Sequence, residues 1–556
     1  MPNADRTALR TKLQVIKPFI FVAANDALDN EKEMADYTCD GTDDDVQILA
    51  AISLLPASGG KVLLSEGTFN ISAPIVLNQS NILLEGNGNS SKLFLSNATN
   101  VNVINLGDGT GSVTGMIVRN LYIDGNMANQ TTTCYGIYLF ADADNALIEN
   151  CNINNTRNDN IYVNTNCDDV IIRNNVCDTT KVGSGGSNIF SDGTRTRIEG
   201  NFFSNADYSG IFVYQNGINA IVLNNRVETS LTDFIRVDGI SSIIDGNIIT
   251  VGATFTGDYP IAITDKTTVS NNTIYIGDLA DPIGDGNGII QSYGKYNSII
   301  NNSMYFTNLD VGHWGICTEA PSGEGQNLIS GNVIINIAGS PNHIDSRAIQ
   351  LADNNNVCTS NHIIGFEYGV RDYQNNEWNN NTISSNMFYN VSYPIYFTEG
   401  SSLAISSNVL KNCKTGIFKT GNGASKYITI SANSIFDCDN EAMILRSIQY
   451  STISGNSIAD AGNTADDTYA AISLITASGT NYSSYNTLTG NIITSGAANV
   501  QKYGIRENSA NDGPNIVVGN TCTMAGTANI SLQHVSSINE HNIDDIITTT
   551  TTTTIV

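Results

Sequence analysis

Apolar and polar positions recur along this chain in a fixed frame. An apolar residue is followed three positions later by asparagine, and two positions after that comes another apolar residue. The spacing between frames runs from 22 residues, between Asn225 and Asn247, to 35 residues, between Asn456 and Asn491. A repeat of this length is typical of a solenoid, in which one unit cannot bury its apolar face without its neighbours. The fourteen asparagines of the frame are Asn175, Asn201, Asn225, Asn247, Asn272, Asn302, Asn332, Asn361, Asn386, Asn408, Asn433, Asn456, Asn491 and Asn520.

The repeating unit reads as strands. Each frame alternates with a period of two, so that pairs such as Ile430 and Ile435 can face one interior. A second short apolar run follows in most repeats, for example at 136–139 and 210–213. Short strands separated by Asn, Gly, Asp and Ser predict an all-β fold, a single-stranded parallel β-helix. One inward asparagine per coil would stack on its neighbours as a ladder of amides.

The region before the repeats differs from them. Residues 1–38 lack the frame, and we expect an N-terminal arm or attachment segment there. Within 39–72, Ile48, Ala51, Ile52 and Leu55 follow helical spacing after three aspartates, and Pro56 ends the run. This amphipathic helix would cap the open end of the solenoid and cover its apolar side chains and strand edges. We assign 73–545 to the parallel β-helix and 546–556 to a Thr-rich C-terminal tail.

The order of motifs within 39–72 carries a resemblance to a known family. DGTDD at 40–44, an amphipathic helix, GGKV at 59–62 and EGTF at 66–69 resemble the N-terminal signature of the pectate-lyase-like superfamily. That superfamily includes polysaccharide lyases, glycoside hydrolases and many phage tailspikes. The resemblance implies a right-handed β-helix with an N-terminal cap, and it leaves the reaction open because one fold serves many functions.

Composition narrows the partners. Asp and Glu outnumber Lys and Arg by 53 to 26, which gives a net charge of −27. Such a surface repels nucleic acid and anionic lipid, so we expect neither as a partner, and no stretch is apolar enough for membrane insertion. The chain begins without a visible secretory signal, so a signal has been removed or the protein leaves its cell by lysis, as virion proteins do.

The ten cysteines fall largely on inward positions of the frame. We interpret them as buried thiols that act as small apolar side chains. Cys413 and Cys438 each lie five residues after a frame asparagine, so they should be neighbours on adjacent coils. This pair is the best candidate for a disulfide, and no zinc-ligand spacing is present.

A column of outward aromatic residues is expected on the second run. Tyr138, Tyr162, Phe190 and Phe212 take the same position in consecutive coils, and Arg236 takes it in the next. An exposed aromatic column can stack sugar rings or pack against another subunit. Aromatic residues are also common strand formers, which leaves a third interpretation open.

Carboxylates follow the same run. On neighbouring coils they would be ~5 Å apart, and two coils apart ~10 Å, which brackets the separations used by retaining and inverting glycosidases. We therefore name Asp238, Asp265 and Glu319 as the candidate acid/base set, with Arg236 available for a charged group of the substrate. The alternative is that these are ordinary turn residues of an Asp-rich solenoid.

Two further clusters are candidates. The loop at 277–287 carries Asp278, Asp281 and Asp285, whose oxygen ligands would suit calcium, although the EF-hand spacing is absent. Calcium or an arginine would serve a lyase reaction, which must neutralise a uronate. His313 and Trp314 lie close to Glu319, and Trp314 is a candidate for stacking on a sugar.

Together these features favour a phage-type tailspike or tail-fibre receptor-binding protein. It would bind host surface polysaccharide as a homotrimer on a virion tail or in the extracellular space, and depolymerase activity toward the bound glycan is left open. One alternative is a secreted monomeric polysaccharide lyase or glycoside hydrolase. Another is a structural surface or filament protein that uses the solenoid as a spacer.

Overall fold

The computed structural model describes residues 18–180, 183, 185–228, 230–252, 255, 257, 259–277, 288–307, 313–319, 323, 325–337, 345–373, 378–463, 469–476, 481–495, 501–523 and 528–544. The chain divides into two compact units. Unit 1 comprises Met1–Gly284 with Ile289–Gln291, and unit 2 comprises Asp285–Gly288 with Ser292–Val556. Each unit is a parallel β-helix, so the all-β fold predicted from the sequence is confirmed.

Most coils contribute one strand to each of three columns, which we name A, B and C, and the long strands β6 (Ile82–Leu95) and β9 (Ile117–Asp124) run through both A and B. In unit 1, column A also includes β12 (Leu147–Glu149), β15 (Ile171–Arg173), β18 (Arg197–Glu199), β21 (Ile221–Leu223), β24 (Ile243–Asp245) and β27 (Thr268–Ser270). Column B also includes β13 (Asn152–Thr156), β16 (Val176–Thr180), β19 (Phe202–Phe203), β22 (Arg226–Glu228), β25 (Ile248–Val251) and β28 (Thr273–Ile276). Column C includes β5 (Ile75–Leu77), β7 (Ile104–Leu106), β10 (Ile137–Leu139), β14 (Ile161–Val163), β17 (Ile189–Ser191), β20 (Ser209–Val213), β23 (Asp233–Val237) and β26 (Tyr259–Ile263).

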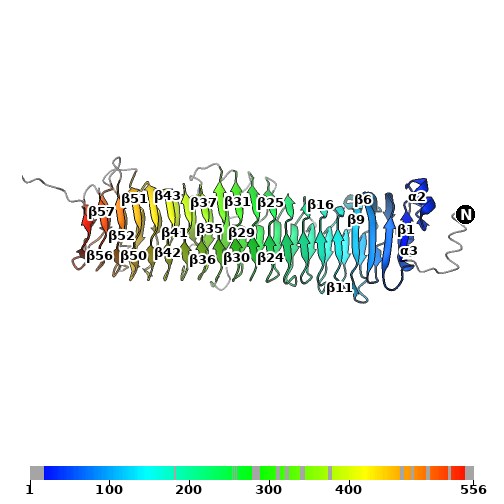
Figure 1. Ribbon diagram of the computed structural model, residues 1–556, viewed down its shortest axis with the longest axis horizontal. Coiled ribbons are helices and arrows are strands. Elements are labelled where there is room, and N and C mark those ends of the chain that lie inside the picture. The colour runs from blue at the N-terminus through cyan, green and yellow to red at the C-terminus, as the bar shows by residue number, and fades with distance from the viewer. Residues whose placement is uncertain are drawn as a thin grey trace, which may run out of the picture. The chain divides into compact units, whose positions relative to one another are not determined.

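Unit 2 repeats the same three columns. Column A comprises β33 (Leu328–Ser330), β36 (Val357–Thr359), β39 (Thr382–Ser384), β42 (Ala404–Ser406), β46 (Thr429–Ser431), β50 (Thr452–Ser454), β53 (Thr487–Thr489) and β56 (Ile516–Val518). Column B comprises β34 (Val333–Asn336), β37 (His362–Ile364), β40 (Met387–Tyr389), β43 (Val409–Cys413), β47 (Ser434–Cys438), β51 (Ser457–Ala461), β54 (Ile492–Thr494) and β57 (Thr521–Thr523). Column C comprises β32 (Trp314–Thr318), β35 (Arg347–Leu351), β38 (Tyr368–Asp372), β41 (Tyr393–Phe397), β44 (Ile417–Lys419), β48 (Met443–Arg446), β52 (Ala470–Ile475) and β55 (Tyr503–Glu507). Figure 1 shows column A strands such as β42, β50 and β56 stacked side by side.

The core of each coil is built from residues in identical register. Ile405 pairs with Ile430 and Ile430 with Ile453, and all three side chains are fully buried. β-branched side chains suit this stacking because they pack well against neighbours on the pleated surface. Every coil therefore covers the apolar layer of the one before it.

The solenoid begins earlier than the sequence suggested. β1 (Phe19–Ala23) pairs in parallel with β3 (Gly60–Leu64), and β2 (Tyr37–Thr38) pairs with β1. The prediction of an arm over 1–38 is therefore wrong for residues 19–38, which also hold the short helix α2 (Asp29–Met34). This first coil contains no asparagine of the frame, so the repeating pattern could not identify it. Residues 1–17, like the tail at 546–556, lie outside the described residues.

The capping helix is present as α3 (Asp45–Ser53). Ile48, Ala51 and Ile52 are its buried apolar residues, as its spacing predicted. The aspartates at the start of the helix do not cap it, since no side-chain hydrogen bond closes its N-terminus. Instead, the Asp45 carboxylate accepts a hydrogen bond of 2.7 Å from the Ser72 backbone N–H, so it fastens the helix to the first coils.

The asparagine ladder lies at the corner between columns A and B. Asn175 donates to Asn201 Oδ1 from its backbone nitrogen at 2.8 Å and from Nδ2 at 3.1 Å. The same pair of bonds continues in each unit and extends past Asn520 to Asn542. A second ladder that the frame did not predict lies at the start of column A, in Asn297, Asn327, Asn356 and Asn381.

Candidate functional site

The aromatic column predicted from the sequence exists on column C of unit 1. Tyr138 pairs in register with Tyr162, Tyr162 with Phe190 and Phe190 with Phe212. The rings of Tyr138 and Tyr162 stack with centroids 5.0 Å apart and planes 5° apart, and those of Tyr162 and Phe190 stack at 4.7 Å and 6°. Phe212 meets Phe190 edge to face at 5.3 Å. The alignment of these residues was thus predicted correctly.

Their stacking changes what the column can bind. Each ring face lies against the next ring, so the column presents ring edges rather than open faces to solvent. Tyr138, Tyr162 and Phe190 are half-buried, and Phe212 is only 9% exposed. Burial raises the pKa of Tyr162 to about 12. A role for these four residues in carbohydrate binding stays a prediction, limited to contacts along the ring edges.

Arg236 takes the next position of the column, and neighbouring side chains hold its guanidinium in place. Its guanidinium lies 5.2 Å from the centroid of the Phe212 ring, and Nε donates to Asp238 Oδ1 at 3.1 Å. A second carboxylate, Asp233, lies 3.7 Å from NH1, and the Tyr208 hydroxyl accepts from NH1 at 3.2 Å. Arg236 and Asp238 are therefore brought together, as an ion pair over an aromatic ring.

The other two members of the acid/base set do not join them in register. Val237 pairs with Ile263, which sets Thr264 rather than Asp265 opposite Asp238. The Thr264 hydroxyl donates to the Asp238 carbonyl at 3.0 Å. Glu319 is exposed and belongs to unit 2. The predicted acidic column is thus displaced by one residue at Asp265, and a catalytic role for the set stays a prediction.

A buried carboxyl group lies beside the aromatic column. Asp159 is 4% exposed, two residues before Ile161, and its Oδ1 accepts a hydrogen bond of 2.6 Å from the Ser187 backbone N–H. Burial raises the pKa of Asp159 to about 7, and the Ser187 hydrogen bond opposes the shift. A carboxyl group that titrates near neutrality can exchange a proton at physiological pH.

His313 and Trp314 were predicted to contact sugar, and their burial contradicts this. Trp314 is 3% exposed and His313 is 2% exposed. The Arg347 guanidinium lies 3.9 Å from the centroid of the Trp314 ring and forms an ion pair with Asp345 at 2.6 Å. One face of the Trp314 ring therefore lies against the Arg347 guanidinium, and burial of the side chain leaves no face open to a sugar.

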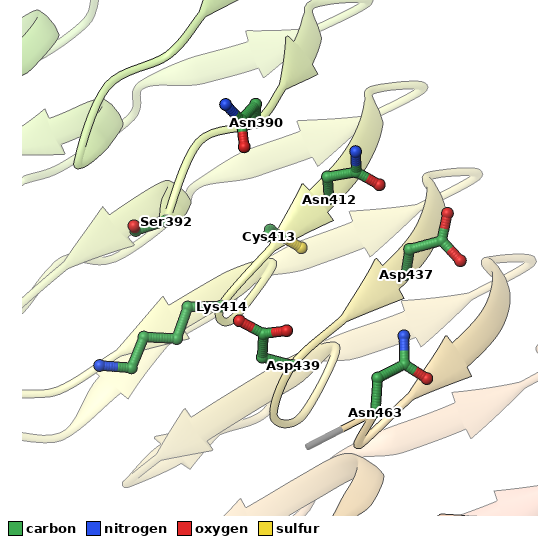
Figure 2. A pocket seen from close by; sticks show the side chains of 8 residues that line it. All are labelled: Asn390, Ser392, Asn412, Cys413, Lys414, Asp437, Asp439 and Asn463. Atoms are coloured by element: carbon green, nitrogen blue, oxygen red, sulfur yellow. The ribbon is translucent and has the colours of Figure 1, made fainter. Parts of the chain in front are cut away.

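Unit 2 contains a groove that the sequence did not reveal. Its volume is about 350 Å³, and it lies where column B strands turn toward column C. Figure 2 shows that its side chains come from successive coils and include amides, carboxylates, a hydroxyl and an amine. The lining residues are Asn390, Ser392, Asn412, Cys413, Lys414, Asp437, Asp439 and Asn463.

Backbone conformation fixes this corner. Asn390, Asn412 and Asp437 have φ values of 55°, 55° and 54°, a left-handed conformation that Asn and Asp tolerate better than most residues. The Lys414 amine lies 5.6 Å from the centroid of the Tyr393 ring. The hydrogen bond between these two side chains is the main cause of the raised pKa of Lys414. The amine of this lining lysine is thus held against an aromatic residue of column C.

Cys413 and Cys438 are direct partners in the register of β43 and β47, with their sulfur atoms 2.6 Å apart. Both are buried, and the adjacency predicted from the sequence is confirmed. All ten cysteines are buried. They therefore fit the predicted role as core side chains.

The sequence missed the groove because its residues lie at the ends of column B strands and in the turns that follow them. Turn positions carry no apolar period, and Asn, Asp and Ser are expected at any corner of a solenoid. The one available signal was the recurrence of Asn or Asp shortly after each frame asparagine, at Asn390, Asn412 and Asp437.

Metal binding finds no support in the described part of the chain. Asp278, Asp281 and Asp285 lie outside the described residues, so the calcium prediction stays untested. Among the residues that are described, no group of three or more His, Cys, Asp or Glu side chains could hold a metal ion. The same described residues include no helix with the length and apolar character needed to cross a membrane.

Comparison with known proteins gives matches at the level of the fold. A family model described as "Periplasmic copper-binding protein (NosD)" matches residues 325–554, which is less than half of the chain. Among the described residues of this span, no three His, Cys, Asp or Glu side chains gather in a group that could hold a metal ion. No curated protein matches the chain in sequence.

Several solved structures are similar. The ORF18 protein of Geobacillus virus E2 is 14% identical, with a TM-score of 0.33, over 55% of this chain, which spans about half (54%) of that protein. The surface adhesin PfbA of Streptococcus pneumoniae is 17% identical, with a TM-score of 0.42, over 63% of this chain and 94% of the adhesin. A tailspike mutant of Escherichia coli bacteriophage HK620 in complex with a pentasaccharide is 11% identical, with a TM-score of 0.35, over 89% and 76%.

The stacked coils, the capping helix and the amide ladder agree with the resemblance found in the sequence. In fold, the chain is a parallel β-helix protein with an N-terminal capping helix.

Proposed function

We propose that this protein binds a polysaccharide of a cell surface, in the manner of a phage tailspike or tail fibre, and that the groove of unit 2 holds the glycan. The observation that carries the proposal is the composition of the groove. Amide, carboxylate, hydroxyl and amine groups line one volume of about 350 Å³. That volume is within the range of small-molecule sites.

The chemistry of the lining suits sugar hydroxyls. Each hydroxyl both donates and accepts, and asparagine side chains answer with one donor group and one acceptor group. Asp437 and Asp439 add acceptors, and Lys414 adds a donor that carries charge.

The repeat adds length to the site. Asn390, Asn412, Asp437 and Asn463 come from successive coils, so similar groups recur at the coil spacing of ~4.8 Å. A polymer with a regular repeat can contact several of them at once, and each added contact raises the affinity. A polysaccharide therefore fits the groove better than an isolated small molecule does.

Assembly into a homo-oligomer, with a trimer as our expectation, is part of the same proposal. The eight strands of columns A and B from β33 to β43 contain no Asp or Glu, although the chain carries a net charge of −27. Leu328, Val357, Met387 and Val409 are exposed there. Copies of so acidic a chain repel each other least across a face without carboxylates, and apolar burial favours their contact. Light scattering of the wild type and of Met387→Lys would measure the assembly and its loss.

The binding test is retention of the protein by polysaccharides in affinity electrophoresis, across a panel of capsular and lipopolysaccharide glycans. Asn412→Gly removes an amide and keeps the left-handed backbone, and Lys414→Ala removes the amine. We expect each to weaken retention severalfold, because one hydrogen bond is worth about 1 kcal/mol. Lys411→Ala is the matched control. Lys411 is an exposed lysine of β43, the strand that contains Asn412, and it lies outside the groove.

Retention of the wild type by none of the glycans, or equal loss in Lys411→Ala, would contradict the proposal. Release of reducing ends, or of unsaturated uronates that absorb in the ultraviolet, would show in the same samples whether the bound glycan is also cut.

A further inference from the structure

Three tyrosines of unit 2 form an exposed ladder at the corner between columns C and A. Tyr427, Tyr450 and Tyr485 are 61%, 48% and 55% exposed. The rings of Tyr427 and Tyr450 lie 5.9 Å apart with planes at 26°, and those of Tyr450 and Tyr485 lie 5.0 Å apart with planes at 3°. We call these three residues the tyrosine ladder.

The backbone at these positions is unfavourable for tyrosine. The φ values of Tyr427, Tyr450 and Tyr485 are 58°, 51° and 59°. Other coils of unit 2 place Asn355 and Asn380 at the same corner, and asparagine is a residue that tolerates this conformation. Strained backbone of this kind persists where function requires the side chain. The fold alone would be served as well by asparagine.

The surroundings of the ladder are nearly uncharged. The short parallel strands β45 (Ser425–Lys426) and β49 (Ile448–Gln449) lead into Tyr427 and Tyr450, and Ser484 bridges to Gln449 beside Tyr485. These segments contribute one lysine and no acidic residue, on a chain with 53 Asp and Glu. The strip is therefore a gap in the acidic surface, lined by aromatic and amide side chains.

We propose that the tyrosine ladder is a second contact surface for the glycan, and that it takes an extended, uncharged segment of polysaccharide lying along the stack of coils. This inference rests on the proposed function. The stacked rings direct their edges and phenolic hydroxyls outward at intervals of 5 to 6 Å, as the centroid distances of 5.0 Å and 5.9 Å show.

The spacing of the ladder selects the type of ligand. An extended chain of pyranose rings advances by nearly the coil spacing for each sugar, so successive sugars can meet successive tyrosines. Tyrosine offers such a chain an apolar edge and a hydroxyl together. Nucleic acid, the other polymer with a short repeat, is repelled by the net charge of −27.

The test is a triple variant, Tyr427→Asn with Tyr450→Asn and Tyr485→Asn, examined as the full chain. Asparagine suits the left-handed backbone, so we expect the unfolding midpoint to stay or rise. We expect retention by the glycan that the wild type binds to fall about tenfold. The conservative triple change to phenylalanine keeps the rings and should retain part of the binding.

The outcomes separate this inference from the groove. Loss of retention in the triple asparagine variant with an unchanged or higher midpoint supports the ladder. Full retention in that variant, together with loss in Lys414→Ala, overturns the ladder alone. Loss of retention accompanied by a large fall in the midpoint overturns the ladder also, because the tyrosines would then be structural. A wild type that binds no glycan overturns both.

Discussion

Asn456 Oδ1 accepts two hydrogen bonds from Asn433, one from its backbone nitrogen at 3.0 Å and one from Nδ2 at 2.9 Å. Asn433 in turn accepts the same two bonds from Asn408. Each asparagine of the ladder therefore satisfies a buried backbone donor of the previous coil and is itself fully buried. Asn433 Nδ2 also donates to the Ile405 backbone carbonyl at 3.0 Å, so the ladder satisfies backbone acceptors as well as donors at this corner.

Replacing one rung should destabilise the protein more than loss of one hydrogen bond would. In Asn433→Ala, the backbone N–H and Nδ2 of Asn408 remain buried without their acceptor. We expect the free energy of unfolding to fall by about 2–4 kcal/mol, measured by denaturant unfolding. Ser434→Ala, at the outward neighbour, is the control and should change it by less than about 0.5 kcal/mol. A loss in Asn433→Ala no larger than in the control would contradict the role of the ladder.

Asp159 predicts a pH dependence of stability. Its pKa in the folded state, about 7, lies above that of an ordinary carboxyl, so the native protein favours the protonated form. Stability from this group is present below about pH 4 and is lost as pH rises toward 7. In Asp159→Asn, the unfolding midpoint should fall less between pH 5 and pH 8 than in the wild type.

Between pH 5 and pH 8, the free energy of unfolding of the wild type should fall more than that of Asp159→Asn, by an amount on the order of a few kcal/mol. Asp142→Asn, at an exposed aspartate of the same unit, should leave the wild-type profile unchanged. Parallel profiles for the wild type and Asp159→Asn would show that Asp159 titrates in its ordinary range.

The Cys413–Cys438 pair predicts a specific response to oxidation. Oxidised glutathione can accept the two electrons as each thiol loses its proton and a disulfide forms between the two coils. Peptide mapping under non-reducing conditions should show one linked peptide pair with the loss of two hydrogens. Cys413→Ser should abolish it, and Cys358, which is buried elsewhere, should remain a free thiol. Complete alkylation of both cysteines after oxidant treatment and denaturation would refute the pairing.

Substitution at the Arg236–Asp238 ion pair distinguishes a structural role of Asp238 from a catalytic one. Asp238→Asn should lower the free energy of unfolding by less than about 1 kcal/mol, because the arginine is one-third exposed and retains Asp233. If Asp238 and Asp265 act as acid and base, Asp238→Asn and Asp265→Asn should each stop release of reducing ends and leave glycan retention intact. Full cleavage by either variant would exclude that residue from catalysis.

The residues that gather on the surface depended on more than the repeat. Asp265 misses the position opposite Asp238 by one residue because the turn after Ile263 includes Thr264 in the paired position. Trp314 is covered by Arg347, which comes from the next strand of column C, 33 residues later in the chain. Neither contact follows from the repeat of the frame, since turn length varies from coil to coil and long side chains reach from one coil to the next.

The sequence by itself determined the coil. Inward isoleucines and asparagines recur with the strand period. That period is a local property, so it can be seen within the sequence of every repeat. Only the tertiary structure decided which outward and corner residues meet, as in the groove beside Lys414 and in the ladder of Tyr427, Tyr450 and Tyr485. These side chains come from coils more than twenty residues apart, and turns of unequal length set their alignment, so no local pattern records it.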